Sequence, residues 1–234
     1  MTATTRIAIL LFEGFDVMDV AGPYEVLRWL PNAQVSFVAR QRGPIASEGG
    51  GLSLVADTAL SELPHPDILV VPGGAGELPA RDDAQICDWL RGAASADAYL
   101  VSVCTGALLL GAAGLLRGKR ATTYWMALDE LPKFGATPLR QRYVFDGKLV
   151  TSAGVSAGID MSLALAAALR GPEVAQAIQL GIEYAPEPPF DTGSPDTAPA
   201  DMVARLRAMS RFGKPSQRTD AREQIAQAAP SDRG

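Results

Sequence analysis

The sequence predicts an α/β protein whose doubly wound, mostly parallel sheet carries helices on both faces. Short runs rich in branched apolar residues alternate with helical patterns, which is typical of βαβ units. Several runs lack the polar and apolar alternation of a strand with one solvated face, so they fit strands buried on both faces. A chain of 234 residues, 47% of them hydrophobic, is long enough to bury one sizeable core.

Strands and helices are predicted in alternation along the chain. The predicted strands cover residues 6–12, 34–40, 67–71, 98–103 and 148–153. The predicted helices cover residues 23–30, opened by Pro23, and then 82–96, 105–116, 125–131 and 156–170. Residues 44–57 hold three consecutive glycines between two short β-like segments, which predicts a small β-hairpin appended to the sheet.

The C-terminal part has a different composition. A proline-rich loop covers residues 184–201, and an amphipathic helix follows it, marked by Met202, Val203, Leu206 and Met209. The residues after this helix are polar and favour exposure or disorder. We therefore expect a single domain over residues 1–212 and a polar tail over residues 213–234.

Charge and apolar content exclude several kinds of partner. The net charge is −5, from 26 acidic and 21 basic residues spread along the chain, so we expect no nucleic acid and no membrane surface as a partner. No stretch reaches the roughly 18 to 20 apolar residues that a membrane span needs. The N-terminal apolar run is too short for a signal sequence, and we expect a cytoplasmic protein.

Two cysteines and one histidine limit the chemistry. Cys87 and Cys104 form no disulfide framework, and we expect both to be free thiols in a reducing compartment. His65 precedes its strand whereas Cys104 follows another, so parallel pairing puts them at opposite edges of the sheet, roughly 15 to 17 Å apart. These few side chains exclude an ordinary zinc site, and no metal is expected.

Cys104 is the first candidate for a functional side chain. It directly follows the apolar run LVSV, at the carboxyl edge of the sheet where parallel α/β proteins bind ligands. The segment S-V-C-T-G, residues 102–106, has small residues two before and two after the cysteine, which is the pattern of a nucleophile elbow. The N-terminus of the following helix is expected to lower the pKa of the thiol. The alternative is a small buried apolar residue, the usual role of a free cysteine.

Two further loops are expected to meet Cys104 at this edge. Residues 72–76, PGGAG, end another inner strand, and the N–H groups of Gly74 and Thr105 form an oxyanion hole there unless the loop is a plain turn. The glycine spacing here and in residues 111–120 fits neither a dinucleotide fingerprint nor a phosphate loop. Asp19 lies just ahead of the predicted first helix, where it either transfers protons or braces its loop.

Together these segments resemble the DJ-1/PfpI superfamily and, within it, the isocyanide hydratase group. The resemblance covers about residues 6 to 200 and rests on AILLFEGFDVMDVAGPYEVL, VVPGG, SVCTGALLLGAAGLLRGKRATTYW, SAGVSAGIDMSL and EYAPEPPFDTGSPDTA. It implies a flavodoxin-like sheet, a homodimer and no cofactor. The implied reaction is hydration of a small-molecule isocyanide to an N-substituted formamide.

The resemblance also implies a role for each candidate residue. Cys104 is the nucleophile that forms a thioimidate, and Asp19 is the general acid and base in a D-x-x-G-P pattern. Thr105 is a hydrogen-bonding neighbour of the cysteine. Gly73 and Gly74 belong to the backbone donor set around the substrate.

An isocyanide with an apolar substituent needs a mostly hydrophobic pocket with a few polar groups. Trp125, Met126 and Phe190 are the candidates for its wall. The alternative for each of them is ordinary core packing.

One position departs from the superfamily pattern. This chain has Tyr124 in T-T-Y-W where many relatives have histidine in T-T-H-W, so that position supplies no imidazole. The change weakens a second reading, a glyoxalase or deglycase acting on 2-oxoaldehydes, in which a histidine assists the cysteine. A third reading is a non-enzymatic redox sensor based on oxidation of Cys104. The segment after Pro199 is too short for a helix-turn-helix module with its linker.

Overall fold

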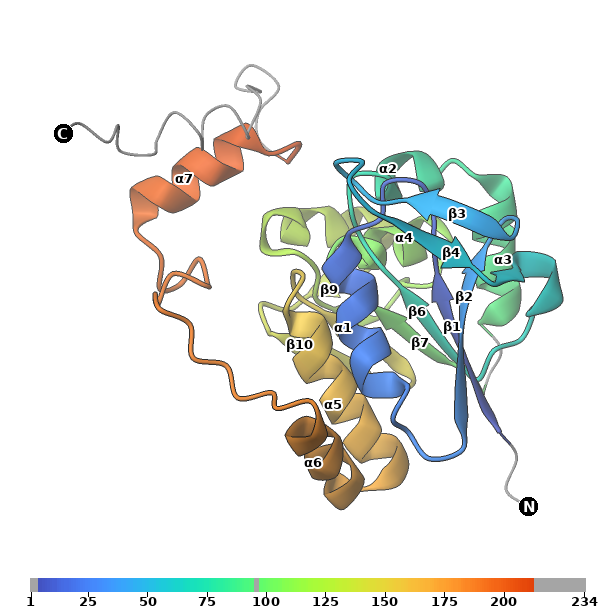
Figure 1. Ribbon diagram of the computed structural model, residues 1–234. Coiled ribbons are helices and arrows are strands. Elements are labelled where there is room, and N and C mark those ends of the chain that lie inside the picture. The colour runs from blue at the N-terminus through green and yellow to red at the C-terminus, as the bar shows by residue number, and fades with distance from the viewer. Residues whose placement is uncertain (1–3, 95–96, 213–234) are drawn as a thin grey trace. The chain divides into compact units, whose positions relative to one another are not determined.

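The computed structural model describes residues 4–94 and 97–212 and divides the chain into two units, Met1–Tyr184 and Ala185–Gly234 (Figure 1). The predicted polar tail, residues 213–234, lies outside the described residues. The single domain expected over residues 1–212 stays a prediction.

A seven-stranded sheet forms the centre of the first unit. Its order is β10-β11-β7-β6-β1-β2-β5, with β1 Thr5–Leu10, β2 Ala33–Ala39, β5 Thr58–Ala59, β6 Ile68–Val71, β7 Tyr99–Ser102, β10 Tyr143–Asp146 and β11 Leu149–Ser152. Every neighbouring pair is parallel except β10 and β11. The predicted strands are confirmed as β1, β2, β6, β7 and β11, which form the inner, doubly wound part of the sheet.

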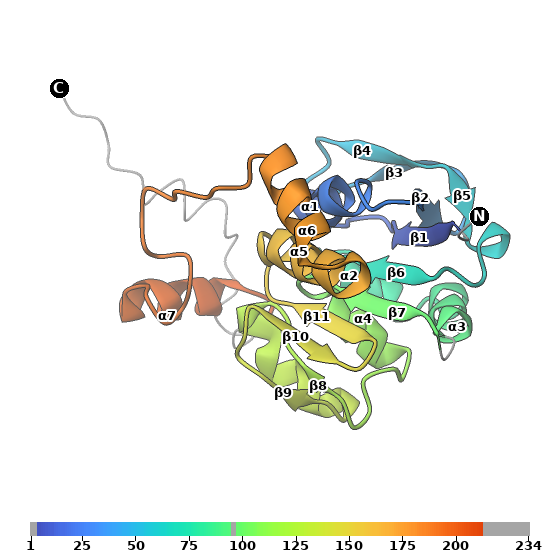
Figure 2. The same ribbon diagram turned by 90° about the horizontal axis from the view of Figure 1, so that it is seen from below.

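Helices cover both faces of this sheet. Figures 1 and 2 show α1, Val17–Leu27, and α5, Ala157–Arg170, on one face, and α3, Ala84–Ala93, and α4, Gly106–Ala112, on the other. The shorter segments are η1 Leu60–Glu62, α2 Glu77–Ala80, η2 Trp125–Phe134 and α6 Pro172–Gly181. The central strands are consequently buried on both sides, and all four residues of β6 and of β11 are buried.

Smaller elements lie outside the main sheet. The predicted hairpin is confirmed as β3, Gly43–Ala46, and β4, Ser53–Ala56, which pair antiparallel in a sheet of their own. A second small sheet pairs β8, Arg120–Ala121, with β9, Thr137–Pro138. In the second unit, the predicted C-terminal helix is α7, Ala200–Met209, and none of its residues is buried. No helix in the described part of the chain is long and apolar enough to cross a bilayer.

The first helix begins earlier than predicted. Asp16 caps it, since its side chain accepts hydrogen bonds from the N–H groups of Met18 and Asp19 at 2.9 and 3.3 Å. Pro23 therefore lies inside α1 rather than at its first position. A proline there leaves the carbonyl four residues earlier, that of Asp19, without its helical N–H donor. Asp19 is thus in the first turn of α1, not ahead of the helix.

Glycines let α1 and α5 pack closely. A Cβ atom on Gly22 would lie 3.1 Å from Ile159 Cγ1. A Cβ atom on Gly158 would lie 3.1 Å from Val103 Cγ1 and 3.3 Å from Pro23 Cδ. These contacts hold the middle of α1 against the start of α5 and the residue after β7. Asp19, one turn before Gly22 and Pro23, therefore lies close to Cys104.

Candidate active site

Cys104 sits at a sharp turn between β7 and α4. Its φ angle is +55°, in the left-handed region that a residue with a side chain rarely adopts. Two hydrogen bonds fix this backbone: Cys104 N–H donates to the Ala153 carbonyl at 3.1 Å, and Thr123 Oγ1 donates to the Cys104 carbonyl at 2.6 Å. Gly106 permits the turn, because a Cβ there would lie 2.1 Å from the Val71 carbonyl oxygen. The strained turn has the backbone of the predicted nucleophile elbow.

Asp19 reaches the same point from α1 and is completely buried. Gly73 N–H donates to its Oδ2 at 2.8 Å. Oδ1 has no N–H or O–H partner within hydrogen-bonding distance among residues 4–94 and 97–212. The side chain of Cys104 lies close enough to this carboxyl group that each group affects the pKa of the other. The structure therefore brings together an acid and a thiol that lie 85 residues apart in the sequence (104 − 19).

Burial controls the protonation of this pair. Loss of solvent raises the pKa of Asp19 well above its usual value, the charge of Asp16 raises it further, and the Gly73 hydrogen bond opposes the shift. Burial also raises the pKa of Cys104 well above its usual value, and the Asp19 charge adds to that effect. A thiolate and a carboxylate cannot both persist here, so the pair retains a proton at neutral pH.

The expectation that the helix N-terminus lowers the pKa of Cys104 was wrong. Helix α4 has only seven residues, Gly106–Ala112, and the thiol is buried with a carboxyl group beside it. The Val155 and Thr105 N–H groups do hydrogen-bond the sulfur and lower its pKa, but desolvation is the larger effect.

Gly73 and Gly74 form a tight loop against Thr105. A Cβ on Gly73 would lie 2.5 Å from Thr105 Oγ1 and 3.0 Å from Asp19 Oδ2, so no larger residue fits. Gly74 has φ of +117°, and its N–H donates to Thr105 Oγ1 at 3.2 Å. Of the predicted Gly74 and Thr105 donor pair, only the Thr105 N–H hydrogen-bonds the sulfur; the Gly74 N–H is directed to the Thr105 hydroxyl.

Two residues near the pair were not predicted from the sequence. Val155, at φ +41°, gives its N–H to the Cys104 sulfur from the turn between β11 and α5. Because Val155 follows a predicted strand at its carboxyl end, the sequence could have indicated that it lies near the site. Glu48, at the tip of the β3–β4 hairpin, accepts a hydrogen bond from Ala75 N–H at 2.6 Å, and its charge raises the pKa of Asp19. No local pattern distinguishes Glu48 from other polar residues of a hairpin tip.

The sequence matches the DJ-1/PfpI family over residues 5–168. This chain belongs to the DJ-1/PfpI family. It is 50% identical over 205 residues to the isonitrile hydratase of Pseudomonas putida, covering 87% of this chain and 90% of that protein. The crystal structure of a THiJ/PfpI family protein from Pseudomonas syringae is similar, with 38% identity and a TM-score of 0.86 over 90% of this chain and 88% of that chain. Drosophila melanogaster DJ-1beta, 23% identical with a TM-score of 0.71 over 78% of this chain and all of that chain, shares the fold.

The three predicted wall residues of this DJ-1/PfpI protein, Trp125, Met126 and Phe190, have different surroundings. Trp125 and its neighbour Tyr124 are half-buried, and their rings meet edge to face at 5.9 Å. Burial, followed by the charge of Cys104, raises the pKa of Tyr124 to about 12, so its hydroxyl stays protonated. Met126 is buried. Phe190 belongs to the second unit, where it is exposed.

Two residues that were predicted to lie away from the site do so. His65 is exposed before β6, at the opposite edge of the sheet, where its carbonyl accepts a hydrogen bond from Arg6. Cys87 lies within α3, and its thiol faces the Arg81 carbonyl at 3.3 Å. No cluster of three metal-binding side chains occurs among the described residues.

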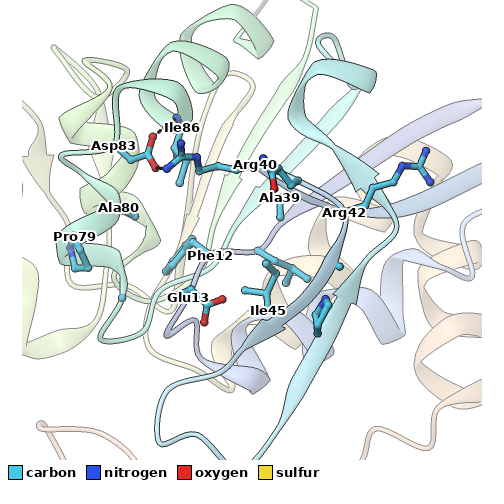
Figure 3. A pocket seen from close by; sticks show the side chains of 15 residues that line it. Phe12, Glu13, Ala39, Arg40, Arg42, Ile45, Pro79, Ala80, Asp83 and Ile86 are labelled. Carbon is cyan, nitrogen blue, oxygen red and sulfur yellow. Dashed lines mark hydrogen bonds and ion pairs between the residues drawn. The ribbon is translucent and has the colours of Figure 1, made fainter.

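A separate cavity of about 520 Å³ opens between the hairpin and helices α2 and α3 (Figure 3). Phe12, Ile45 and Ile86 line it, and the Arg40 to Asp83 ion pair spans one side. Neither Cys104 nor Asp19 contributes to this cavity of the DJ-1/PfpI fold.

Proposed function

We propose that this protein is an isonitrile hydratase, which adds water to an isocyanide to give an N-substituted formamide. The observation that carries the proposal is the buried Cys104 and Asp19 pair with its retained proton. The 50% identity to the Pseudomonas putida isonitrile hydratase, over most of both chains, supports the same reaction.

In the first step, the sulfur of Cys104 forms a bond to the terminal isocyanide carbon. The proton held by the Cys104 and Asp19 pair moves to that carbon, and the product is a thioimidate, R–N=CH–S–Cys104, with Asp19 left as a carboxylate. An isocyanide carbon must gain a proton as it gains a nucleophile. A thiol and a carboxyl group with raised pKa values supply the nucleophile and the proton in one site.

In the second step, Asp19 accepts a proton from water while the oxygen adds to the thioimidate carbon. Asp19 passes that proton to the nitrogen. As the C–S bond breaks, Asp19 takes up the proton of the added hydroxyl group, and R–NH–CHO leaves. The thiolate that departs is stabilised by the N–H groups of Val155 and Thr105. The net reaction consumes one water, and the pair regains its proton.

The remaining candidates orient this pair. Gly73 N–H holds one oxygen of Asp19, and the Thr105 hydroxyl accepts the Gly74 N–H, so the PGG loop is fixed against the elbow. Trp125 stands beside Tyr124 as part of the wall for the substituent of the isocyanide. These groups act without a metal or an organic cofactor in the proposed reaction.

Histidine-assisted reactions on 2-oxoaldehydes receive less support. The only histidine, His65, is exposed at the far edge of the sheet. Tyr124 occupies the position near Cys104 and keeps its proton at neutral pH, so it cannot act as a base there.

We also propose that the protein works as a cytoplasmic homodimer. Met18 in α1 and Leu52 and Val55 around the hairpin are large apolar side chains with exposed fractions of 42%, 44% and 62%. The Phe15 to Ser47 bridge joins the start of α1 to this hairpin, so these side chains belong to one region of the first unit. Sedimentation equilibrium measures the assembly state directly.

The test of the reaction is an ultraviolet assay of a simple aryl isocyanide with the purified protein, with the formamide identified by NMR. Wild-type protein should convert the isocyanide, and Cys104→Ala should abolish conversion while its circular dichroism stays native. Conversion of methylglyoxal but not of the isocyanide would refute the proposal in favour of a glyoxalase. Activity of Cys104→Ala above a few per cent would refute the covalent route.

A further inference from the structure

The turn at residues 153–155 lies against Cys104 and is strained. The Ala153 carbonyl accepts the Cys104 N–H at 3.1 Å, and the Val155 N–H hydrogen-bonds the sulfur. Val155 adopts φ of +41°, which is costly for a β-branched residue. Such a conformation persists only when neighbouring groups hold it.

Tyr124 is the neighbour that packs on this turn. A Cβ atom on Gly154 would lie 2.7 Å from Tyr124 Cδ2 and 3.3 Å from Cε2, so the ring lies against the bare backbone of Gly154. Tyr124 is itself anchored to the elbow, because the preceding Thr123 donates to the Cys104 carbonyl at 2.6 Å. The ring of Trp125 meets the Tyr124 ring edge to face, with 5.9 Å between the ring centroids.

We propose that Tyr124 is a positioning residue whose ring holds the 153–155 turn so that the Val155 N–H stays on the sulfur of Cys104. The ring and Gly154 form a matched pair, because the ring fills the volume that a side chain at 154 would need. This inference rests on the proposed function, in which that N–H stabilises the thiolate released with the formamide. Its test by thiol reactivity, however, needs no isocyanide.

The first measurement is the pH dependence of iodoacetamide alkylation of Cys104 in a Cys87→Ser background. Tyr124→Leu keeps an apolar side chain but removes the ring, so the Val155 hydrogen bond should weaken and the apparent pKa of Cys104 should rise. A rise of about one unit lowers the thiolate fraction about tenfold below that pKa. Tyr124→Phe keeps the ring and should leave the alkylation profile within about twofold of the parent.

The second measurement is a double-mutant cycle with Gly154→Ala, a change that leaves Tyr124 in place. The added Cβ must displace the ring, so Gly154→Ala alone should slow alkylation as Tyr124→Leu does. In the Tyr124→Leu background the same change should have little further effect, because the ring is already absent. Rates are compared well below the melting temperature of each variant.

Three results would overturn the inference. Alkylation of Tyr124→Phe as slow as that of Tyr124→Leu would assign the effect to the hydroxyl. Additive effects of Tyr124→Leu and Gly154→Ala would show that ring and glycine act independently. Unchanged alkylation rates in both the Tyr124→Leu and the Gly154→Ala variants would show that the 153–155 turn keeps its conformation without the ring. Failure of wild-type protein to hydrate an isocyanide would refute the proposed function alone and would leave these alkylation rates interpretable.

Discussion

In the proposed mechanism, the buried pair of Asp19 and Cys104 serves as acid, base and nucleophile. Each group alone would cost stability on ionisation, because burial raises both pKa values. The Gly73, Thr105 and Val155 N–H groups recover part of that cost by hydrogen-bonding the charged forms. In the proposed reaction this pair gives its proton to the isocyanide carbon without the help of a histidine.

The Asp19→Asn variant should lose activity and gain stability at neutral pH. The amide cannot transfer a proton, so kcat should fall by about 10² to 10⁴. The pKa of Asp19 is raised in the folded protein, so wild-type stability declines as pH rises from the unfolded pKa of about 3.9 toward the folded value. The variant lacks this decline, so its melting temperature should exceed that of wild type by an amount that grows as the pH rises above about 4.

Calorimetry across this pH range, with kinetics on the same samples, checks both parts. A residue that only braces its loop would give the opposite pattern, with a lower melting temperature and kcat largely kept. His65→Ala serves as the control and should leave kcat unchanged, because His65 is exposed at the other edge of the sheet.

The same Asp19→Asn variant should react faster with iodoacetamide than wild type at pH 8. The Asp19 charge raises the pKa of Cys104, so its removal lets the thiolate form at lower pH. Mass spectrometry of labelled peptides identifies the modified residue, and Cys87, buried within α3, should label slowly in both proteins. An unchanged Cys104 rate would mean that the two groups do not share a proton.

At the level of elements, glycines set how closely strands, helices and loops approach the site. The most crowded of them near Cys104 is Gly106, where a Cβ would lie 2.1 Å from the Val71 carbonyl oxygen and 2.8 Å from that of Pro72. Both are backbone atoms, which cannot turn aside as a flexible side chain can. The first residue of α4 is therefore fixed by the end of β6.

Gly106→Ala should destabilise the protein by about 1 to 3 kcal/mol and reduce activity strongly, although alanine favours helices. Gly92→Ala in α3 is the matched control, since a Cβ there has no neighbour within 4 Å. That control should be neutral or more stable by up to about 1 kcal/mol. Urea unfolding of both variants measures the difference; equal stabilities would show that α4 and β6 can separate without cost.

The sequence allowed the inner strands to be predicted because their apolar runs depend only on burial by two layers of helices. The start of α1 was predicted too late in the chain, because Pro23 suggested the first helical position and the capping role of Asp16 was not recognised. The contact between Tyr124 and Gly154 joins residues 30 positions apart (154 − 124), and no local pattern reports it. The direction of the Cys104 pKa shift could not be predicted from the sequence either, because it depends on how deeply the thiol is buried in the folded protein.

For the whole molecule, the two units differ in what stabilises them. The first contains the sheet and its buried core, whereas the α7 helix of the second has no buried residue. A helix that buries none of its residues contributes little hydrophobic free energy to folding.

A chain ending at Tyr184 should therefore fold cooperatively, with a melting temperature within a few degrees of that of the full chain. Differential scanning calorimetry of the two chains compares their transitions. A large loss of melting temperature would show that residues after 184 stabilise the sheet domain, in agreement with the single domain predicted over residues 1–212.

The retained proton has a consequence for oxidative damage. Peroxides attack thiolates, and each unit of increase in thiol pKa lowers the thiolate population about tenfold at a given pH below that pKa. A cysteine whose pKa is raised by burial and by the Asp19 charge is thus a slow target for peroxide while the site is empty. In the proposed reaction the isocyanide carbon takes up the shared proton as the sulfur attacks it, so Cys104 reacts with its substrate without first forming a free thiolate.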